Sequence, residues 1–89
     1  MAKFLKPRFS PKFQKRFKKL HPSLKKKFAK QLEFILINPR HPSLNIKKMR
    51  GTNMFEARLD YHNRFVFKIV NDELWLYSIG PHDEGLGKK

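Results

Sequence analysis

The side chains in this sequence that could do chemistry are cations and a histidine in its C-terminal half. Arg58 and Arg64 lie in segments where apolar and polar residues alternate, and His82 stands in a Gly-Pro-His-Asp break. Arginines stabilise the negative charge of a phosphate, and a histidine titrates near neutral pH and can move a proton. Metal-free RNA cleavage needs such groups, because a base must activate the 2′-hydroxyl while cations hold the crowded phosphate. These residue types therefore favour the binding, and possible cleavage, of RNA.

Three segments with a period of two must position these side chains. MFEARLDY, RFVFKIV and ELWLYSI follow one another, separated by short polar turns, which predicts a meander of three antiparallel strands. We place Asp60 opposite Arg64 and a two-residue turn at Asn71 and Asp72, so that one face is apolar and His82 lies near Arg64. The other face then gathers Glu56, Arg58, Asp60, Arg64, Val66, Lys68, Trp75, Tyr77 and Ile79.

Two basic amphipathic helices are predicted before these strands. Ser10 reads as an N-cap with Pro11 at the first helical position, and Pro22 opens a second helix that ends before Pro39. Residues 4–6 are expected to form a short edge strand and residues 39–53 a loop. The predicted fold class is α+β. It is one domain, residues 1–89, with an N-terminal antiparallel helical hairpin packed on one face of a small, mostly antiparallel sheet that ends in the meander.

The net charge of +14 is unevenly distributed. Residues 1–50 contain 16 Lys and Arg against one acid, whereas residues 51–89 contain 5 against 6, so the halves carry +15 and −1. So basic a half points to a polyanion, either nucleic acid or an anionic membrane surface. The cations that we single out for RNA or ribosome binding are Lys25, Lys26, Lys27, Lys47, Lys48, Arg50 and Lys68, with Trp75 and Tyr77 as base-stacking contacts.

Composition also excludes some classes of site. The chain has no cysteine, so it has neither a disulfide framework nor a thiolate metal site. Its four histidines match no metal-ligand spacing, and we expect no metal and no cofactor. No apolar run approaches the ~20 residues that span a bilayer, and the N-terminus lacks the apolar core of a signal peptide. We therefore expect a soluble cytoplasmic protein without a membrane partner.

Each candidate also has a plainer structural explanation. Arg64 could form a cross-strand ion pair with Asp60, and Arg58 and Glu56 could be ordinary residues of a solvated face. Trp75 and Tyr77 could cover a second small cluster with two aliphatic side chains. His82 could belong to a turn that ends the strand.

The order of motifs resembles the RelE/ParE superfamily of bacterial toxin–antitoxin toxins. The matching features are the Met-Arg-Gly at 49–51, Phe55 at the start of the next strand, Arg64 at the start of the one after, and the Ile-Gly at 79–80 that precedes His82. The resemblance covers about residues 11–83. It implies helices packed on one face of a mostly antiparallel sheet, with the active site on the concave side.

The resemblance also implies an activity and partners. RelE-like members are ribosome-dependent endoribonucleases that cut mRNA, and their basic surface meets ribosomal RNA. By position, Arg64 would stabilise the scissile phosphate, Arg58 would be a second cation, and His82 would be the proton donor or base. Glu56 stands where RelE has a lysine, which makes a carboxylate base possible. The partner would be an acidic or amphipathic antitoxin.

Two other functions stay open at this point. The ParE branch has the same fold, lacks the nuclease residues and inhibits DNA gyrase; Glu56 and the lack of a tyrosine after His82 favour that branch. A basic nucleic-acid-binding module without toxin activity is the third possibility. Fold alone does not decide between them.

Overall fold

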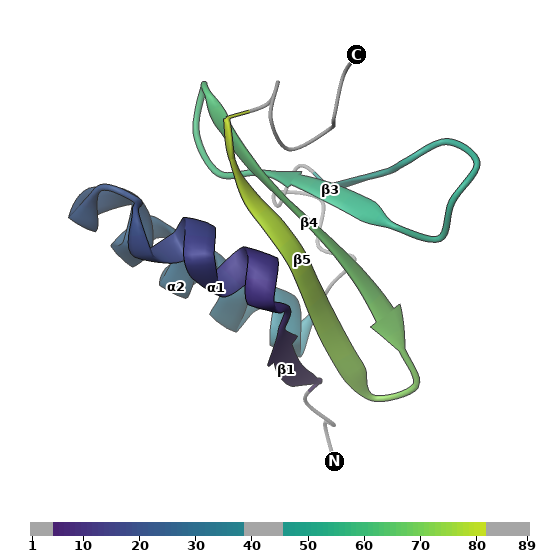
Figure 1. Ribbon diagram of the computed structural model, residues 1–89. Helices are drawn as coiled ribbons and strands as arrows, with labels where there is room; N and C mark the ends of the chain where they lie inside the picture. Colours follow the sequence, from purple (N-terminus) through teal and green to yellow (C-terminus); the bar gives the residue numbers. More distant parts are fainter. Residues whose placement is uncertain (1–4, 39–45, 82–89) are drawn as a thin grey trace.

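The computed structural model describes residues 5–38 and 46–81, in which two helices lie on one face of a five-stranded sheet (Figure 1). The elements are β1 (Lys6–Phe9), α1 (Pro11–Lys18), α2 (Pro22–Ile37), β2 (Ile46–Lys48), β3 (Phe55–Arg58), β4 (Asn63–Val70) and β5 (Glu73–Pro81). The strand order is β1-β5-β4-β3-β2. β1 runs parallel to β5, and the other neighbours are antiparallel. The predicted α+β class is confirmed.

Both helices begin where the sequence predicts. The Ser10 hydroxyl accepts a hydrogen bond from the Phe13 backbone N–H at 3.0 Å, which makes Ser10 the N-cap of α1. Proline opens each helix, where its missing N–H leaves no bond unmade. α2 ends at Ile37, and Asn38 is its C-cap, whose N–H donates to the Phe34 carbonyl at 2.7 Å. The antiparallel arrangement of the two helices stays a prediction.

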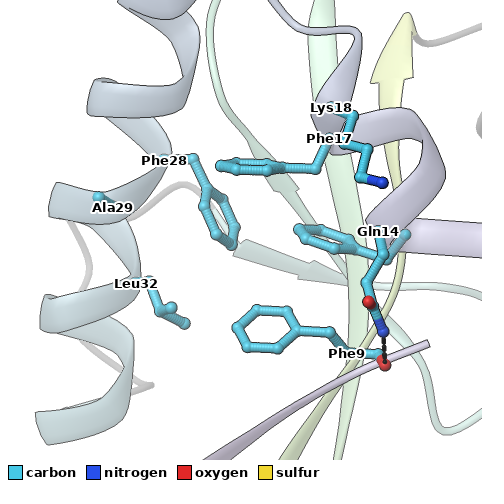
Figure 2. A pocket seen from close by; sticks show the side chains of 8 residues that line it. Phe9, Gln14, Phe17, Lys18, Phe28, Ala29 and Leu32 are labelled. Carbon is cyan, nitrogen blue, oxygen red and sulfur yellow. Dashed lines mark hydrogen bonds between the residues drawn. The ribbon is translucent and has the colours of Figure 1, made fainter. Parts of the chain in front are cut away.

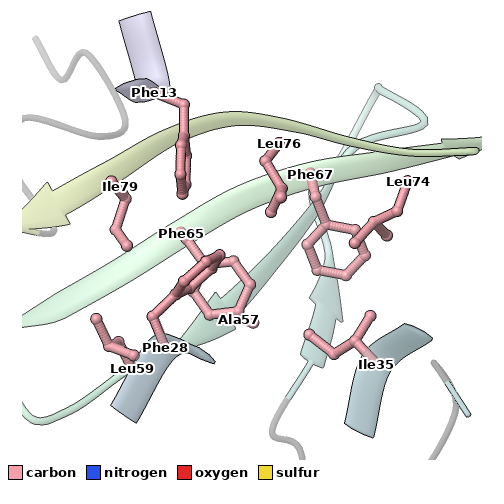
Figure 3. Close-up of a cluster of buried hydrophobic side chains, with 10 residues drawn as sticks. All are labelled: Phe13, Phe28, Ile35, Ala57, Leu59, Phe65, Phe67, Leu74, Leu76 and Ile79. Carbon is pink, nitrogen blue, oxygen red and sulfur yellow. The ribbon is translucent and has the colours of Figure 1, made fainter. Parts of the chain in front are cut away.

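The core lies between the helices and the sheet (Figure 3). Phe28 of α2 joins the two layers, because its ring centroid lies 5.3 Å from Phe13 and 5.1 Å from Phe65. Burial of each such side chain stabilises the fold by about 1.5–3 kcal/mol. The buried cluster consists of Phe13, Phe28, Ile35, Ala57, Leu59, Phe65, Phe67, Leu74, Leu76 and Ile79.

The two edge strands differ from the prediction. Of the strand predicted over residues 4–6, Lys6 begins β1, Leu5 precedes it, and Phe4 lies outside the described residues; β1 covers Lys6–Phe9 and pairs with β5. β2 lies inside the segment predicted as a loop, where Ile46 pairs with Ala57 and contacts the core. A three-residue strand is too short to leave a periodic pattern in the sequence.

The register of the first hairpin is shifted by two residues from the prediction. Arg58, and not Asp60, stands opposite Arg64. Asp60 instead holds the turn, because its Oδ1 accepts hydrogen bonds from the backbone N–H groups of His62 and Asn63 at 2.9 and 2.7 Å. Burial raises the pKa of Asp60, but these bonds, the Asn63 side chain and the charge of Lys27 outweigh it, so the pKa lies below its ordinary value. A shift by two residues keeps the side chains that remain in β3 and β4 on their predicted faces.

A β-bulge in β5 overturns the predicted position of Ile79. Phe67 pairs with Leu76, as predicted, but Val66 pairs with Ser78, so Tyr77 is the extra residue. Beyond the bulge, Ile79 pairs with Phe65 and is buried in the core, not on the opposite face. Strict alternation fails here because the bulge adds one residue to the period of two.

Candidate functional site

Two arginines face each other on the side of the sheet away from the helices, here called the open face. Arg58 ends β3 and Arg64 begins β4, and the register places them directly opposite. Directly opposite side chains in an antiparallel pair have Cβ atoms about 4.5–5.5 Å apart, and like charges there repel. The Arg58 side chain makes no ion pair with any residue in 5–38 or 46–81. Such a pair can hold an anion.

Glu56 lies beside this pair and is nearly buried. Its Oε1 is 3.7 Å from Nη1 of Arg64, and the side chains of Glu56 and Arg64 are only 10% and 21% exposed. Part of the Arg64 charge is thus balanced within the protein. Within the described part of the chain, Arg64 Nε has no hydrogen-bond acceptor. Glu56 is therefore a neighbour of the arginine pair and not an ordinary solvated residue.

Gly80 completes the row across the sheet, opposite Arg64 on β5. Its φ of +148° is one that residues with a Cβ rarely adopt. A Cβ here would lie 3.7 Å from Nη1 of Arg16, so the Arg16 guanidinium of α1 approaches the end of β5. The row Arg58–Arg64–Gly80 thus has an arginine from a helix near its β5 end.

The predicted stacking residues lie on the same face, further along β4 and β5. Lys68 pairs with Trp75, and Lys68 Nζ is 5.7 Å from the centroid of the Tyr77 ring. The Trp75 indole N–H donates to Oε1 of Glu73 at 3.1 Å. These three predicted residues are therefore neighbours, and all are partly buried.

Only some of the predicted basic residues share the open face with these groups. Lys26 and Lys27 are exposed on α2, while Lys25 is partly buried and its Nζ lies 5.7 Å from the centroid of the Phe17 ring. Lys47 pairs with Glu56 and so belongs to the open face, whereas Lys48 pairs with Phe55. Arg50 is exposed in the turn after β2. α2 itself packs on the face of the sheet opposite to the open face (Figure 1).

An apolar groove opens on the helix side (Figure 2). Its volume is about 400 Å³, and Phe9, at its β1 end, is 40% exposed. The Gln14 side chain donates to the Phe9 carbonyl at 3.0 Å. The lining residues are Phe9, Phe13, Gln14, Phe17, Lys18, Phe28, Ala29 and Leu32.

His82, the predicted proton-transfer residue, lies outside the described residues. Its neighbour Pro81 pairs with Asn63, next to Arg64. No three His, Asp or Glu side chains gather as a metal site within residues 5–38 and 46–81. None of the helices in the same ranges is long and apolar enough to cross a membrane.

Sequence reasoning missed two residues of the open face. Arg8 on β1 pairs with Trp75, and Glu73 connects the two because it accepts hydrogen bonds from both side chains. The parallel pairing of β1 with β5 spans nearly the whole chain, and no local pattern signals it. The sequence pattern marked Glu73 only as the residue that follows a predicted turn.

Comparison with known proteins supports the resemblance through structure alone. No protein-family model matches the chain, and no curated protein matches its sequence. Among solved structures, the archaeal RelE–RelB complex from Pyrococcus horikoshii OT3 aligns with a TM-score of 0.76 at 14% identity, over 89% of this chain and 96% of that one.

Two further structures agree. A YoeB/ParE toxin from Agrobacterium tumefaciens aligns with a TM-score of 0.77 at 12% identity, over 88% of this chain and 99% of that one. A mutant of the E. coli toxin RelE in the free state aligns with a TM-score of 0.73 at 23% identity, over 97% and 90%. At these identities the likeness concerns the fold alone, and the chain has the fold of these RelE and YoeB/ParE toxins.

Proposed function

We propose that this protein is a RelE-like toxin that cleaves mRNA on the ribosome. The observation that carries the proposal is the direct opposition of Arg58 and Arg64 on the open face. Two cations in this position repel each other, and a phosphate between them would turn that repulsion into attraction. The toxin fold supports the same conclusion.

The chemistry needs no metal. A base takes the proton of the 2′-hydroxyl, the 2′-oxygen attacks the adjacent phosphorus, and the bond from phosphorus to the 5′-oxygen breaks as an acid protonates that oxygen. Arg64 and Arg58 would stabilise the charge that develops on the phosphate oxygens. DNA lacks the 2′-hydroxyl, so the reaction would be specific to RNA.

Glu56 and His82 are the candidates for proton transfer. Glu56 is nearly buried and lies 3.7 Å from Arg64, so a phosphate held by Arg64 would lie near its carboxylate. His82 follows the residue that pairs next to Arg64 and can serve as the acid for the 5′-oxygen. The two groups would then act from β3 and from the end of β5.

Ribosome binding would use the basic half of the chain. The +15 charge of residues 1–50 suits ribosomal RNA. Lys26 and Lys27 are exposed on α2, on the side of the molecule that the arginine pair does not occupy. The helices would therefore dock on ribosomal RNA while the open face meets mRNA.

A cognate antitoxin is the third expected partner. The P. horikoshii neighbour is a complex of RelE with RelB. We propose that the apolar groove takes apolar side chains of an acidic antitoxin, because α1 beside it carries Lys12, Lys15, Arg16 and Lys18 and no acid. Phe9→Glu should abolish binding of the cognate antitoxin. Phe34→Glu is the matched control, since Phe34 is exposed on α2 but does not line the groove.

Primer extension on a defined mRNA tests the nuclease, with purified protein and with or without translating ribosomes. Cuts should appear only with ribosomes and should disappear in Arg64→Ala and His82→Ala. Lys6→Ala is the control for loss of charge, because Lys6 is an exposed residue of β1, at the far edge of the sheet. Normal cutting by Arg64→Ala would show that the proposed site is wrong.

A ParE-like gyrase inhibitor is the second candidate. The ion pair of Glu56 with Arg64 favours it, because a carboxylate already faces the cation that would hold the phosphate. This function predicts no cuts with or without ribosomes, and inhibition of DNA supercoiling by gyrase at stoichiometric protein. A basic module without either activity would instead show only salt-dependent nucleic-acid binding.

A further inference from the structure

A row of three side chains crosses the open face at the other end of β4 from the arginine pair. Lys68 on β4 pairs with Trp75 on β5, and Trp75 pairs with Arg8 on β1. Side chains in such a row are neighbours on one face of the sheet. The indole therefore lies between two cations that come from the strands on either side.

Hydrogen bonds fix the Trp75 ring. Its N–H donates to Oε1 of Glu73 at 3.1 Å, and Oε2 of Glu73 accepts two bonds from Arg8, at 3.1 and 2.8 Å. The only polar group of the indole is thus satisfied inside the protein. Trp75 is partly buried and does not belong to the hydrophobic core. A second ring lies beside the row, since Tyr77 lies next to Lys68.

The arrangement has the parts of a site for single-stranded nucleic acid. Bases stack on aromatic rings in a sequence-tolerant way, and flanking cations follow the backbone phosphates. Lys68 is four residues along β4 from Arg64, which is about 13 Å at the rise of a strand. A few nucleotides of an extended strand cover that distance.

We propose that Trp75 is a stacking platform for an unpaired RNA base, a few nucleotides from the phosphate held by Arg58 and Arg64. Arg8 and Lys68 contact the phosphates on its two sides. The substrate strand therefore runs along β4 and β5 across the open face. The position of the cut phosphate relative to Trp75 rests on the proposed function, whereas the stacking of a base on Trp75 does not depend on it.

Trp75 is the only tryptophan of the chain, so its fluorescence reports on this position directly. The probe is a short single-stranded RNA with 2′-O-methyl groups, which cannot be cut, carrying a 3′ fluorescein for anisotropy. We expect RNA binding to quench Trp75, and an all-abasic strand of the same length to bind without the quench. Trp75→Leu should weaken binding about tenfold to a hundredfold.

Three variants complete the test. Trp75→Phe keeps a stacking ring and should bind nearly as well as the wild type, which separates stacking from damage to the fold. Tyr61→Leu is the matched control, because Tyr61 is an aromatic residue 80% exposed in the β3–β4 turn, away from the row, and should bind normally. Arg8→Gln should reduce the slope of log affinity against log salt by about one.

RNA that saturates the anisotropy signal without quenching Trp75, or a Trp75→Leu variant that binds like the wild type, would overturn the proposal. Cleavage on ribosomes, measured on the same protein, keeps the two claims separate. Quenching without cleavage would remove the nuclease and keep the platform. Cleavage without quenching of Trp75 would keep the nuclease and remove the stacking platform.

Discussion

Arg58 and Arg64 stand directly opposite each other on β3 and β4. In most sheets such a pair is avoided, because two like charges at this separation destabilise the fold. Glu56 relieves part of the cost, since it lies 3.7 Å from Arg64. Arg58 has no ion-pair partner within residues 5–38 and 46–81. We propose that both cations are there because this site holds an anion.

Replacing Arg58 should therefore separate stability from function. We expect Arg58→Gln to raise the free energy of unfolding by about 0.2–1 kcal/mol, because the cross-strand repulsion disappears. The same variant should lose most of its ribosome-dependent cleavage. Urea unfolding and primer extension measure the two effects. Lys30→Gln removes the same charge from an exposed position of α2 and should change neither stability nor cleavage; a destabilised Arg58→Gln would contradict the argument.

Neutralising Glu56 should have the opposite effect on stability. Glu56→Gln leaves the partly buried Arg64 without its carboxylate, which should lower the free energy of unfolding by about 1–3 kcal/mol. The double variant with Arg64→Gln should recover part of this loss, because no uncompensated charge remains. Urea unfolding of the two single variants and the double variant gives the coupling. If the effects of the two single variants simply add up in the double variant, the 3.7 Å contact between Glu56 and Arg64 contributes no stability.

Some of this arrangement can be read from the sequence and some cannot. The alternation in residues 55–76 places the apolar and open faces correctly, because side chains on a strand repeat every two residues. The order of Ser10, Pro11 and the periodic phenylalanines likewise predicts where α1 begins. These features are local, so a short stretch of chain is enough to specify them.

The features that could not be predicted from the sequence depend on contacts between distant segments or on an interruption of the two-residue alternation. The prediction placed Ile79 on the wrong face because the bulge at Tyr77 adds one residue to β5. No residue type at this position signals a bulge. Arg8 joins Trp75 only through the parallel pairing of β1 with β5. The partner of Arg64 was predicted as Asp60, yet Asp60 caps the turn and Glu56 lies beside the arginine. The turn that Asp60 holds sets the register in which Arg58 stands opposite Arg64.

The lysines of α2 should differ in their effect on ribosome binding. Lys26 is exposed, whereas Lys25 packs its ammonium group 5.7 Å from the Phe17 ring centroid. Lys26→Glu should therefore weaken ribosome association with a steep dependence on salt and leave folding unchanged, while Lys25→Glu should also lower stability. Co-sedimentation with ribosomes at two salt concentrations, beside urea unfolding, checks both. Equal binding by Lys26→Glu and the wild type would exclude this helix from the contact.

Ser10 connects α1 to the bulge of β5. Its hydroxyl accepts from the Phe13 N–H and donates to the Tyr77 carbonyl at 2.8 Å. Ser10→Ala removes the N-cap and should lower the free energy of unfolding by about 1–2 kcal/mol. Hydrogen exchange should speed up at Phe13 and near Tyr77 together. Ser23→Ala, a change of the same size in the first turn of α2, should leave exchange near Tyr77 unaffected.

Asp60 should make the stability of the fold depend on acid pH. The folded protein holds the pKa of Asp60 below its ordinary value of 3.8, through hydrogen bonds to Asn63 and His62 that outweigh burial. The charged form therefore stabilises the folded state fully at neutral pH, and this contribution is lost as the pH falls below about 4 and through the lowered pKa. Asp60→Asn keeps an oxygen acceptor but no charge. Urea unfolding of both proteins should show the wild type more stable at pH 7, with the difference shrinking towards pH 2; a difference that does not change with pH would mean that the turn is held by hydrogen bonds that need no charge.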